Sequence, residues 1–239
     1  IIVLIIVIIS IDNKYESITT LHPTEKESNL ATMANRYSGL AAIAGVSLPG
    51  TDEISNSEVA IEILKSEDFF LSLYQKNNFL PDLIAYDSYN AITKQSSYKE
   101  KIFDTKSKKW IRKVSYPQEK IPSIREAYKK FHKHHFQINK DEKTGIINLS
   151  VKHESPHIAQ NWLNHIVYNI NKYMQDSEVE RAQKSLNFIK EQMNNTQNNQ
   201  LLEVLASMAE AKIQTVMLSE VSDEFVFRII QKPTISNYK

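Results

Sequence analysis

Residues Glu154–Gln200, ESPHIAQNWLNHIVYNINKYMQDSEVERAQKSLNFIKEQMNNTQNNQ, decide the fold of this chain. Pro156 suits the first position of a helix, where the N–H that proline lacks would have no partner, and Ser155 has the chemistry of an N-cap. From Pro156 to about Asn194 neither glycine nor proline interrupts the sequence. The stretch therefore predicts one helix of about 55–60 Å, whereas an average helix measures about 17 Å.

The apolar pattern of this helix changes along its length. The first half carries a face broad enough to pack on a sheet, made of Ile158, Ala159, Trp162, Leu163, Ile166, Val167, Ile170, Tyr173 and Met174. After the polar QDSEVER a narrow stripe follows, made of Ala182, Leu186, Ile189 and Met193. Its spacing of four, three and four residues is typical of a helix–helix contact.

The polar NNTQNNQ predicts a turn, after which a second helix returns from Leu201 to about Leu218. The apolar face of the returning helix contains Leu201, Leu205, Met208, Ala209 and Ile213. Because this helix is shorter than the first, it covers only part of the narrow stripe. We therefore expect Ala182, Leu186, Ile189 and Met193 to contact another subunit.

The rest of the chain predicts an α+β base with a small sheet, from which the helical hairpin protrudes. Three segments supply its strands: Lys14–Leu21, the hairpin Phe136–Ile138 with Gly145–Val151, and Glu224–Ile230, which Pro233 closes. Three segments supply its helices: Ser57–Leu64, Ser66–Asn77 and a capped helix from Ser123. Arg36–Gly50, which holds three of the four glycines, is expected to be a mobile or loosely packed loop.

The first residues form the most apolar run of the sequence: Ile1, Ile2, Val3, Leu4, Ile5, Ile6, Val7, Ile8 and Ile9. Nine helical residues rise about 14 Å, which is less than the ~30 Å core of a bilayer. No basic region or cleavage site of a signal peptide is visible, and a core strand is the alternative. We expect the truncated end of a transmembrane helix. The expected parts are 1–10 (membrane helix), 11–155 (base), 156–222 (hairpin) and 223–239 (return strand and lead-in to a second membrane helix).

Composition excludes several classes of protein and site. The 239 residues are 41% apolar, and 29 Lys and Arg nearly balance 28 Asp and Glu, which argues against a general nucleic-acid binder. The chain has no cysteine, so it contains no disulfide, thiolate nucleophile or cysteine zinc site. Its four glycines form no phosphate-binding loop. We expect no cofactor.

Residues 98–120 hold eight Lys and Arg against three Asp and Glu. This excess suits an anionic sugar or a lipid headgroup, with Trp110 as a stacking surface. The candidate contacts are Lys108, Lys109, Trp110, Arg112 and Lys113. A solvated loop with one anchoring tryptophan is the alternative, and we favour it.

Neither a metal site nor a catalytic pair emerges from the sequence. His132 and His135 lie three residues apart, but no carboxylate shares a helical face with them, so we expect surface histidines including His134. A glycan hydrolase would need two carboxyl groups facing each other across a cleft. Adjacent side chains such as Glu67 and Asp68, Asp52 and Glu53, or Asp223 and Glu224 diverge instead. We therefore expect that the protein is not an enzyme.

Eight segments in one collinear order resemble Wzz-type chain-length determinants, the polysaccharide co-polymerases. They are NKYESITTLHP, SGLAAIAGVSL, AIEILKSEDFF, YKEKIFD with KKWIRK, PSIREAYKKF, DEKTGIINLSVKHESPHIAQNW, RAQKSLNFIKEQM and DEFVFRIIQKP, and they run from Lys14 to Pro233. The resemblance implies an inner-membrane protein with two transmembrane helices around a periplasmic domain. It also implies a closed, ring-like homo-oligomer that sets the length of a surface polysaccharide such as O-antigen in lipopolysaccharide biosynthesis, with a Wzy-type polymerase and the polysaccharide or its lipid-linked precursor as partners.

Two features depart from the family, and two alternatives remain. The hairpin tip is brief, and the proline-rich stretch before the second membrane helix is reduced to Pro233.

Bacterial tyrosine autokinases for capsule or exopolysaccharide export share this periplasmic domain, and their kinase would follow the last residue. A periplasmic adaptor of an export channel would need a glycine-rich β domain, which four glycines do not supply.

Overall fold

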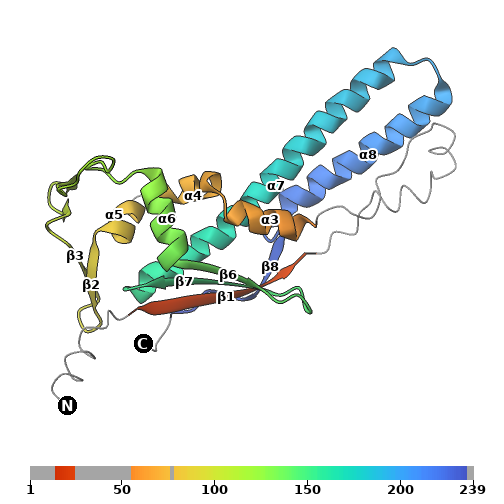
Figure 1. Ribbon diagram of the computed structural model, residues 1–239. Coiled ribbons are helices and arrows are strands. Elements are labelled where there is room, and N and C mark those ends of the chain that lie inside the picture. Colours follow the sequence, from red (N-terminus) through yellow and green to blue (C-terminus); the bar gives the residue numbers. More distant parts are fainter. Residues whose placement is uncertain (1–13, 25–54, 76–77, 236–239) are drawn as a thin grey trace, which may run out of the picture. The chain divides into compact units, whose positions relative to one another are not determined.

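A computed structural model describes residues 14–24, 55–75 and 78–235 of the chain (Figure 1). In chain order the elements are β1 (Tyr15–Pro23), α3 (Asn56–Leu64), α4 (Glu67–Tyr74), α5 (Phe79–Ile84), β2 (Tyr86–Asn90), β3 (Gln95–Tyr98), β4 (Phe103–Asp104), β5 (Lys109–Trp110), α6 (Ile124–His134), β6 (Phe136–Lys140), β7 (Ile147–His153), α7 (Pro156–Asn195), α8 (Asn199–Val221) and β8 (Phe227–Gln231). Among these helices none combines the length and the apolarity needed to cross a bilayer.

The chain divides into two compact units. The first unit, which we call the base, contains β1 as far as His22, the chain from Ile61 to Val167 and the chain from Ile229 onward. The second, which we call the hairpin unit, contains Tyr168–Arg228 and the segment Pro23–Ala60, of which only 23–24 and 55–60 are described. The expected loop Arg36–Gly50 lies outside the described residues.

A four-stranded sheet has the order β6-β7-β1-β8, so the strands predicted at Lys14–Leu21, 136–151 and 224–230 do meet. β1 pairs antiparallel to β7, from Tyr15 opposite His153 to Leu21 opposite Ile147. Strand alternation buries Ser17, Thr19 and Leu21 on one face. The hydroxyls of Ser17 and Thr19 donate to the carbonyl oxygens of Thr234 (2.8 Å) and Gln231 (2.6 Å), which satisfies both groups.

The predicted turns and helix starts follow from local chemistry. In the turn between β6 and β7, the Asp141 carboxylate accepts from the backbone N–H groups of Lys143 and Thr144, and Gly145 adopts φ 68°, a conformation that favours glycine. Ser66 caps α4 by accepting from the N–H of Phe69. Ser123 caps α6 by accepting from the N–H of Glu126. The predicted hairpin and both predicted caps are therefore confirmed.

The core of the base is a cluster of aromatic rings around Trp162 of α7. The Trp162 ring lies 4.6 Å from that of Phe79 and 5.8 Å from that of Phe131, measured between centroids. Phe131 in turn stacks on Phe136 at 5.4 Å and tilts against Phe70 at 5.5 Å. All five rings are buried, so the first turns of α7 hold α4, α5, α6 and β6 together.

α7 runs unbroken for 40 residues, as the sequence predicts. Of the broad face expected on its first half, Ala159, Trp162, Leu163, Ile166, Val167, Ile170 and Met174 are buried. Ile158 is half-buried. Tyr173 was also expected on this face, but its side chain is 51% exposed, so the prediction is wrong for this residue.

Within the hairpin unit, α8 runs back beside the second half of α7. Only Thr196–Asn198 connect the two helices. The side-chain amide of Gln175, twenty residues before Asn195, donates to the carbonyl of Ser219, twenty residues after Asn199. Equal lengths of the two helices therefore face each other over about 30 Å. α8 therefore extends beside the whole narrow stripe, so its length is not what limits how much of the stripe is covered.

Candidate functional site

The narrow stripe on α7 is partly covered within one chain. Ala182 is 2% exposed and Ile189 is 4% exposed, whereas Leu186 and Met193 are half-buried. A contact between subunits at this stripe would therefore involve Leu186 and Met193 far more than the other two residues.

The exposed apolar surface of the hairpin unit lies mainly on α8. Ile213, Met217 and Val221 follow one another at intervals of four residues, which places them on one face of the helix. Their side chains are 49%, 62% and 87% exposed, and we call these three residues the α8 stripe. Further exposed apolar side chains in the same unit are Tyr168, Tyr173, Phe188, Leu201, Met208 and Leu218.

The opposite face of α8 explains why the α8 stripe stays uncovered. Leu205 and Ser219 are the buried residues of α8, and Leu205 belongs to the apolar face expected for the returning helix. Of that expected face, Leu201, Met208 and Ile213 remain exposed, while Ala209 is half-buried. Since a helix buries one side against its neighbour, apolar residues distributed around α8 leave a second side exposed. Apolar surface of this kind is typical of a protein–protein contact.

Among the candidate glycan or lipid contacts, Arg112 has a structural role. Its Nε donates to the carbonyl oxygens of Glu119 and Lys120, and its two Nη atoms donate to the carboxylate of Glu126 at 2.5 and 2.7 Å. Arg112 is 8% exposed, and its guanidinium lowers the pKa of Glu126. Arg112 therefore ties the 112–120 loop to α6, and its charge is not available to an external anion.

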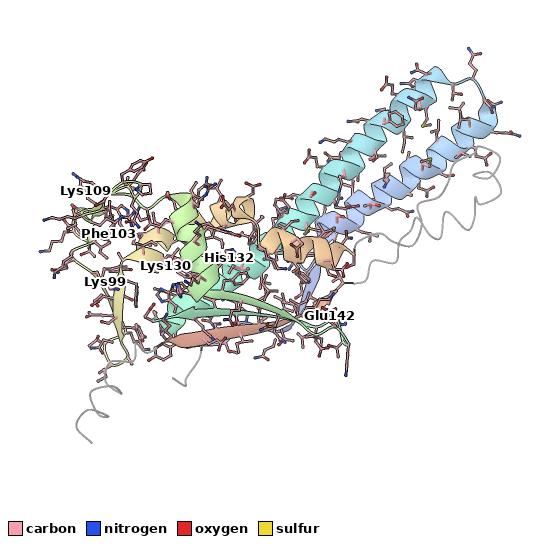
Figure 2. The ribbon with its side chains drawn as sticks, in the orientation of Figure 1. Lys99, Phe103, Lys109, Lys130, His132 and Glu142 are labelled. Carbon is pink, nitrogen blue, oxygen red and sulfur yellow. The ribbon has the colours of Figure 1, made fainter. Side chains whose placement is uncertain are left out.

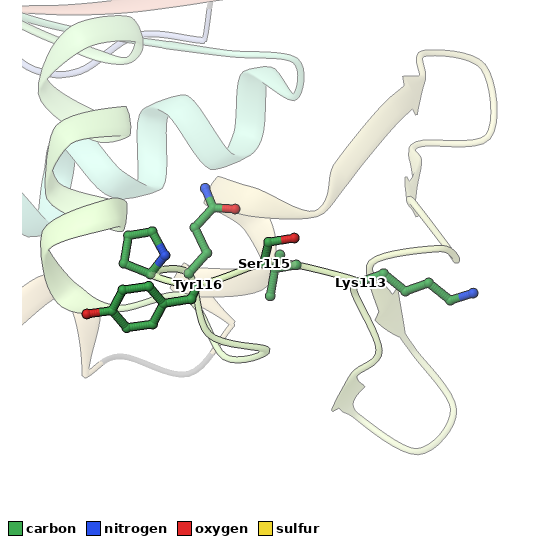
Figure 3. Close-up of a pocket in the computed structure, with 6 residues that line it drawn as sticks. Lys113, Ser115 and Tyr116 are labelled. Carbon is green, nitrogen blue, oxygen red and sulfur yellow. The ribbon is translucent and has the colours of Figure 1, made fainter.

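The other candidates of this segment lie on the surface. Figure 2 shows Lys109 and Lys99 on either side of Phe103, whose ring packs at 5.1 Å against that of Trp110. Trp110 is half-buried, whereas Lys108, Lys109 and Lys113 are exposed. The six residues from Lys113 to Gln118 line a surface pocket, and their side chains are drawn in Figure 3. Apart from Arg112, this segment agrees with the alternative that we favoured, a solvated loop with one anchoring tryptophan.

Two of the three expected surface histidines are covered. His135 is 4% exposed, and its Nδ1 donates to the carbonyl of Lys152 at 2.7 Å. His132 is half-buried on the Tyr128 ring at 4.4 Å, while His134 is exposed. His135 turns inward because α6 ends there and the chain enters β6. Among the described residues no group of three metal-ligating side chains occurs.

His135 lies beside a second buried histidine, His153, which no pattern in the sequence singles out. The His153 ring lies 5.7 Å from that of His135 and 4.9 Å from that of Trp162. Its Nε2 donates to the carbonyl of Asp82, and its Nδ1 accepts from the N–H of Ser155. Burial lowers the pKa of His135 to about 4 and lowers that of His153. Both rings are therefore neutral near pH 7 and fix the backbone around them.

Asp82 of α5 and Tyr98 of β3 form a half-buried polar pair in the base. The Tyr98 hydroxyl donates to the Asp82 carboxylate at 2.6 Å. Burial raises the pKa of Asp82 to about 6, although the tyrosine bond acts in the opposite direction, and burial also raises the pKa of Tyr98. The Asp82 carboxyl group is therefore engaged by a phenol within the base.

The adjacent carboxylates have separate environments. Glu67 lies 3.8 Å from Arg125, and Asp68 is exposed in the first turn of α4. Asp223 is exposed and Glu224 is half-buried at the end of the hairpin unit. Asp52 and Glu53 lie outside the described residues, as do Ile1–Ile9.

Sequence reasoning also missed Asn171, which joins α7 to the chain entering β8. Its Oδ1 accepts from the N–H groups of Val226 and Phe227, both at 2.9 Å, and its Nδ2 donates to the carbonyl of Phe227. Asn171 is 3% exposed. The signal in the sequence is one asparagine on an otherwise apolar helix face, between Ile170 and Met174.

Comparison with known proteins finds similar solved structures, of which two are described here. No protein-family model matches the sequence, and no curated protein matches it either. A fragment of WzzB, a polysaccharide co-polymerase from Salmonella Typhimurium, is 12% identical over 95% of this chain and 98% of its own, with a TM-score of 0.38. A full-length bacterial polysaccharide co-polymerase is 13% identical over 99% of this chain and 80% of its own, with a TM-score of 0.31. Both are described as co-polymerases, the class that the sequence resembles.

Proposed function

We propose that this chain is the periplasmic part of an inner-membrane polysaccharide co-polymerase, which regulates the length of a surface glycan without catalysing a reaction. The observation that carries the proposal is the collinear resemblance of eight segments between Lys14 and Pro233. The described parts of those segments fall on the elements that such a domain needs: the four-stranded sheet of the base, the 40-residue α7 and the return through α8 to β8.

The two flanks of the described chain support attachment to a membrane at one side. The Ser17 hydroxyl, near the start of β1, donates to the carbonyl of Thr234, after β8. The start of β1 and the chain after β8 therefore lie close together in the base. Such an arrangement suits two membrane helices that would flank the base in one bilayer.

The α8 stripe supports assembly with further copies of the same chain. Ile213, Met217 and Val221 expose between about half and most of their apolar side chains in the described chain. In a ring the α8 stripe of one copy would pack on a different face of the next copy, and such a repeated contact closes when its rotation brings the last copy back to the first. The proposed partners are therefore further copies, a Wzy-type polymerase, and the polysaccharide or its lipid-linked precursor.

The proposed mechanism uses binding and geometry. The two buried histidines and the Asp82–Tyr98 pair are occupied by bonds within the base, and Arg112 is occupied by Glu126. Activity would then depend on surfaces that position the polymerase and the growing glycan. A hydrolase or transferase activity of the purified protein that disappears on substitution of one carboxylate would contradict this part of the proposal.

Deletion of the gene tests the function directly. We expect the surface polysaccharide, separated on a gel, to change from a tight length distribution to a broad one, and the intact gene on a plasmid to restore the tight distribution. An unchanged distribution would overturn the proposal. The alternative, the periplasmic domain of a tyrosine autokinase, predicts instead that capsule or exopolysaccharide is lost and that the full protein carries phosphotyrosine.

A further inference from the structure

The turn between β2 and β3 exposes an apolar side chain that no element of the base covers. Ile92 is 94% exposed, although it sits among polar residues in the turn 91–94. The turn has a defined shape: the side-chain oxygen of Asn90 accepts from the N–H groups of Ile92 (2.9 Å) and Thr93 (3.0 Å). Lys94 completes it at φ 56° and is exposed. An isoleucine and a lysine are thus presented together.

The hairpin that carries this turn is fixed to the start of β1. The Tyr89 ring of β2 meets the Tyr15 ring of β1 edge to face at 6.3 Å, and it meets the His157 ring of α7 at 5.9 Å. Side-chain hydroxyls join β2 to β3, with Tyr86 donating to Ser96 at 2.7 Å and Ser88 lying 2.8 Å from Ser97. The position of Ile92 is therefore set relative to Tyr15, within one compact unit.

Tyr15 follows the apolar run Ile1–Ile9 by six residues. Six residues of fully extended chain span about 20 Å at most. If Ile1–Ile9 lie in the bilayer, as the proposed function holds, Tyr15 lies within that distance of the membrane surface, and the Tyr89 ring of the hairpin packs directly on Tyr15. The exposed Lys14 stands at the same place, where a lysine next to an apolar segment meets lipid headgroups.

We propose that the β2–β3 turn contacts the membrane surface, with Ile92 entering the boundary between headgroups and acyl chains and Lys94 meeting lipid phosphates. This inference rests on the membrane attachment in the proposed function. An exposed aliphatic side chain beside a cation is the combination that suits this boundary, because the aliphatic group leaves water and the cation stays at the anionic surface. The contact adds a second attachment point to the base and restricts its tilt.

The test uses the absence of cysteine from the sequence, which allows one spin label per protein. Ile92→Cys carries the label at the proposed contact. Lys143→Cys is the matched control. Lys143 is exposed in the β6–β7 turn, which Glu142 marks in Figure 2. This turn lies at the end of the sheet where Ile147 pairs with Leu21, whereas Tyr15 lies at the other end of β1. Both proteins are reconstituted into vesicles of phosphatidylglycerol and phosphatidylethanolamine. Flotation in a density gradient reports attachment, and collisions of the label with oxygen and with a water-soluble nickel chelate report depth.

We expect both proteins to float and the oxygen-to-nickel collision ratio to be severalfold higher for the Ile92 label than for the Lys143 label. The Lys94→Glu change in the Ile92→Cys protein should reduce that ratio in these anionic vesicles. Flotation with equally water-exposed labels would overturn the membrane contact and leave the membrane attachment standing. Failure of both proteins to float would overturn the attachment and the contact together. The polysaccharide gel of the deletion strain tests chain-length regulation separately.

Discussion

His135 and His153 show how single residues of the base depend on burial. The carbonyl of Lys152 accepts only, so Nδ1 of His135 carries the proton, and the carbonyl of Asp82 assigns the proton of His153 to Nε2. Nδ1 of His153 accepts from the N–H of Ser155, and a second proton there would break that bond. Glu154, 3.8 Å away, is the acidic neighbour that favours the charged ring, but burial outweighs it.

These pKa values predict loss of stability on acidification. The pKa of His135 is about 4 in the folded protein and 6.5 in the unfolded chain, so the folded state binds fewer protons between these values. The free energy of unfolding then falls as the pH drops from 6.5 to 4, by about 3 kcal/mol for this residue. His153 acts in the same direction. Asp82, whose pKa rises from 3.8 to about 6, acts in the opposite direction, since its stabilising protonated form is lost as the pH rises.

Denaturant titrations between about pH 7 and pH 4.5 measure the balance of these three groups. We expect the free energy of unfolding to fall on acidification. In the His135→Asn variant the amide keeps a donor near Nδ1 and cannot titrate, so the fall should become markedly smaller. Asp82→Asn keeps an acceptor for Tyr98 and should make the fall steeper. Equal pH dependence in all three proteins would show that these groups do not control stability.

Arg112 marks the limit of sequence reasoning for single residues. The excess of lysine and arginine in 98–120 predicts a basic surface, and the lysines of that segment are exposed. Nothing in the composition distinguishes Arg112, because its partner Glu126 and the carbonyls of Glu119 and Lys120 come from a later loop and helix. The fork of donors in an arginine suits such a set of acceptors, whereas the compact ammonium of a lysine does not.

At the scale of elements, the longest pattern was the most predictable. α7 follows from a run without glycine or proline and a helical period, and its bounds agree with the prediction to within one residue. α5, with only six residues, is too short for a period to appear. β2 and β3 read YDSYN and QSSY, which lack an alternation of apolar and polar residues, and hydroxyl bonds across the pair hold them instead.

The sequence pattern alone does not predict which face of α7 contacts which face of α8. Both the narrow stripe on α7 and the apolar residues on α8 satisfy the pattern of a helix–helix contact. Which of them is covered depends on how the three-residue connection and the Gln175–Ser219 bond align the helices. The strand β8 starts at Phe227 rather than at the predicted Glu224. At this point the side-chain oxygen of Asn171 accepts hydrogen bonds from the N–H groups of Val226 and Phe227.

Asn171 should be essential for the junction between α7 and β8. Asn171→Leu leaves two buried N–H groups and one carbonyl without this partner, and unsatisfied buried groups cost about 1–3 kcal/mol each. We expect the free energy of unfolding to fall by about 2–4 kcal/mol in a denaturant titration. Asn164→Leu, an exposed position of the same helix, should stay within about 0.5 kcal/mol of the original protein. Equal effects of the two changes would argue against the role of the buried amide.

At the scale of the whole molecule, an aspartate introduced at either of two positions distinguishes an effect on folding from an effect on assembly. Ile189 is covered within a single chain, so Ile189→Asp buries a carboxylate without a partner, at a cost of several kcal/mol, and should lower the melting temperature. Met217 is 62% exposed in the single chain, so Met217→Asp should lower the melting temperature much less than Ile189→Asp does. Both measurements use the whole protein in detergent.

Assembly and polysaccharide length then decide what the α8 stripe does. If Met217 lies against a second copy, its aspartate variant buries a charge only in the oligomer. We therefore expect Met217→Asp to lower the oligomeric mass measured by light scattering and to broaden the polysaccharide distribution on the gel. Lys212→Asp, a charge change elsewhere on α8, is the control for charge alone. A Met217→Asp protein with normal mass and normal polysaccharide would remove the α8 stripe from the interface. An Ile189→Asp protein that melts normally but fails to assemble would assign the interface to the narrow stripe on α7.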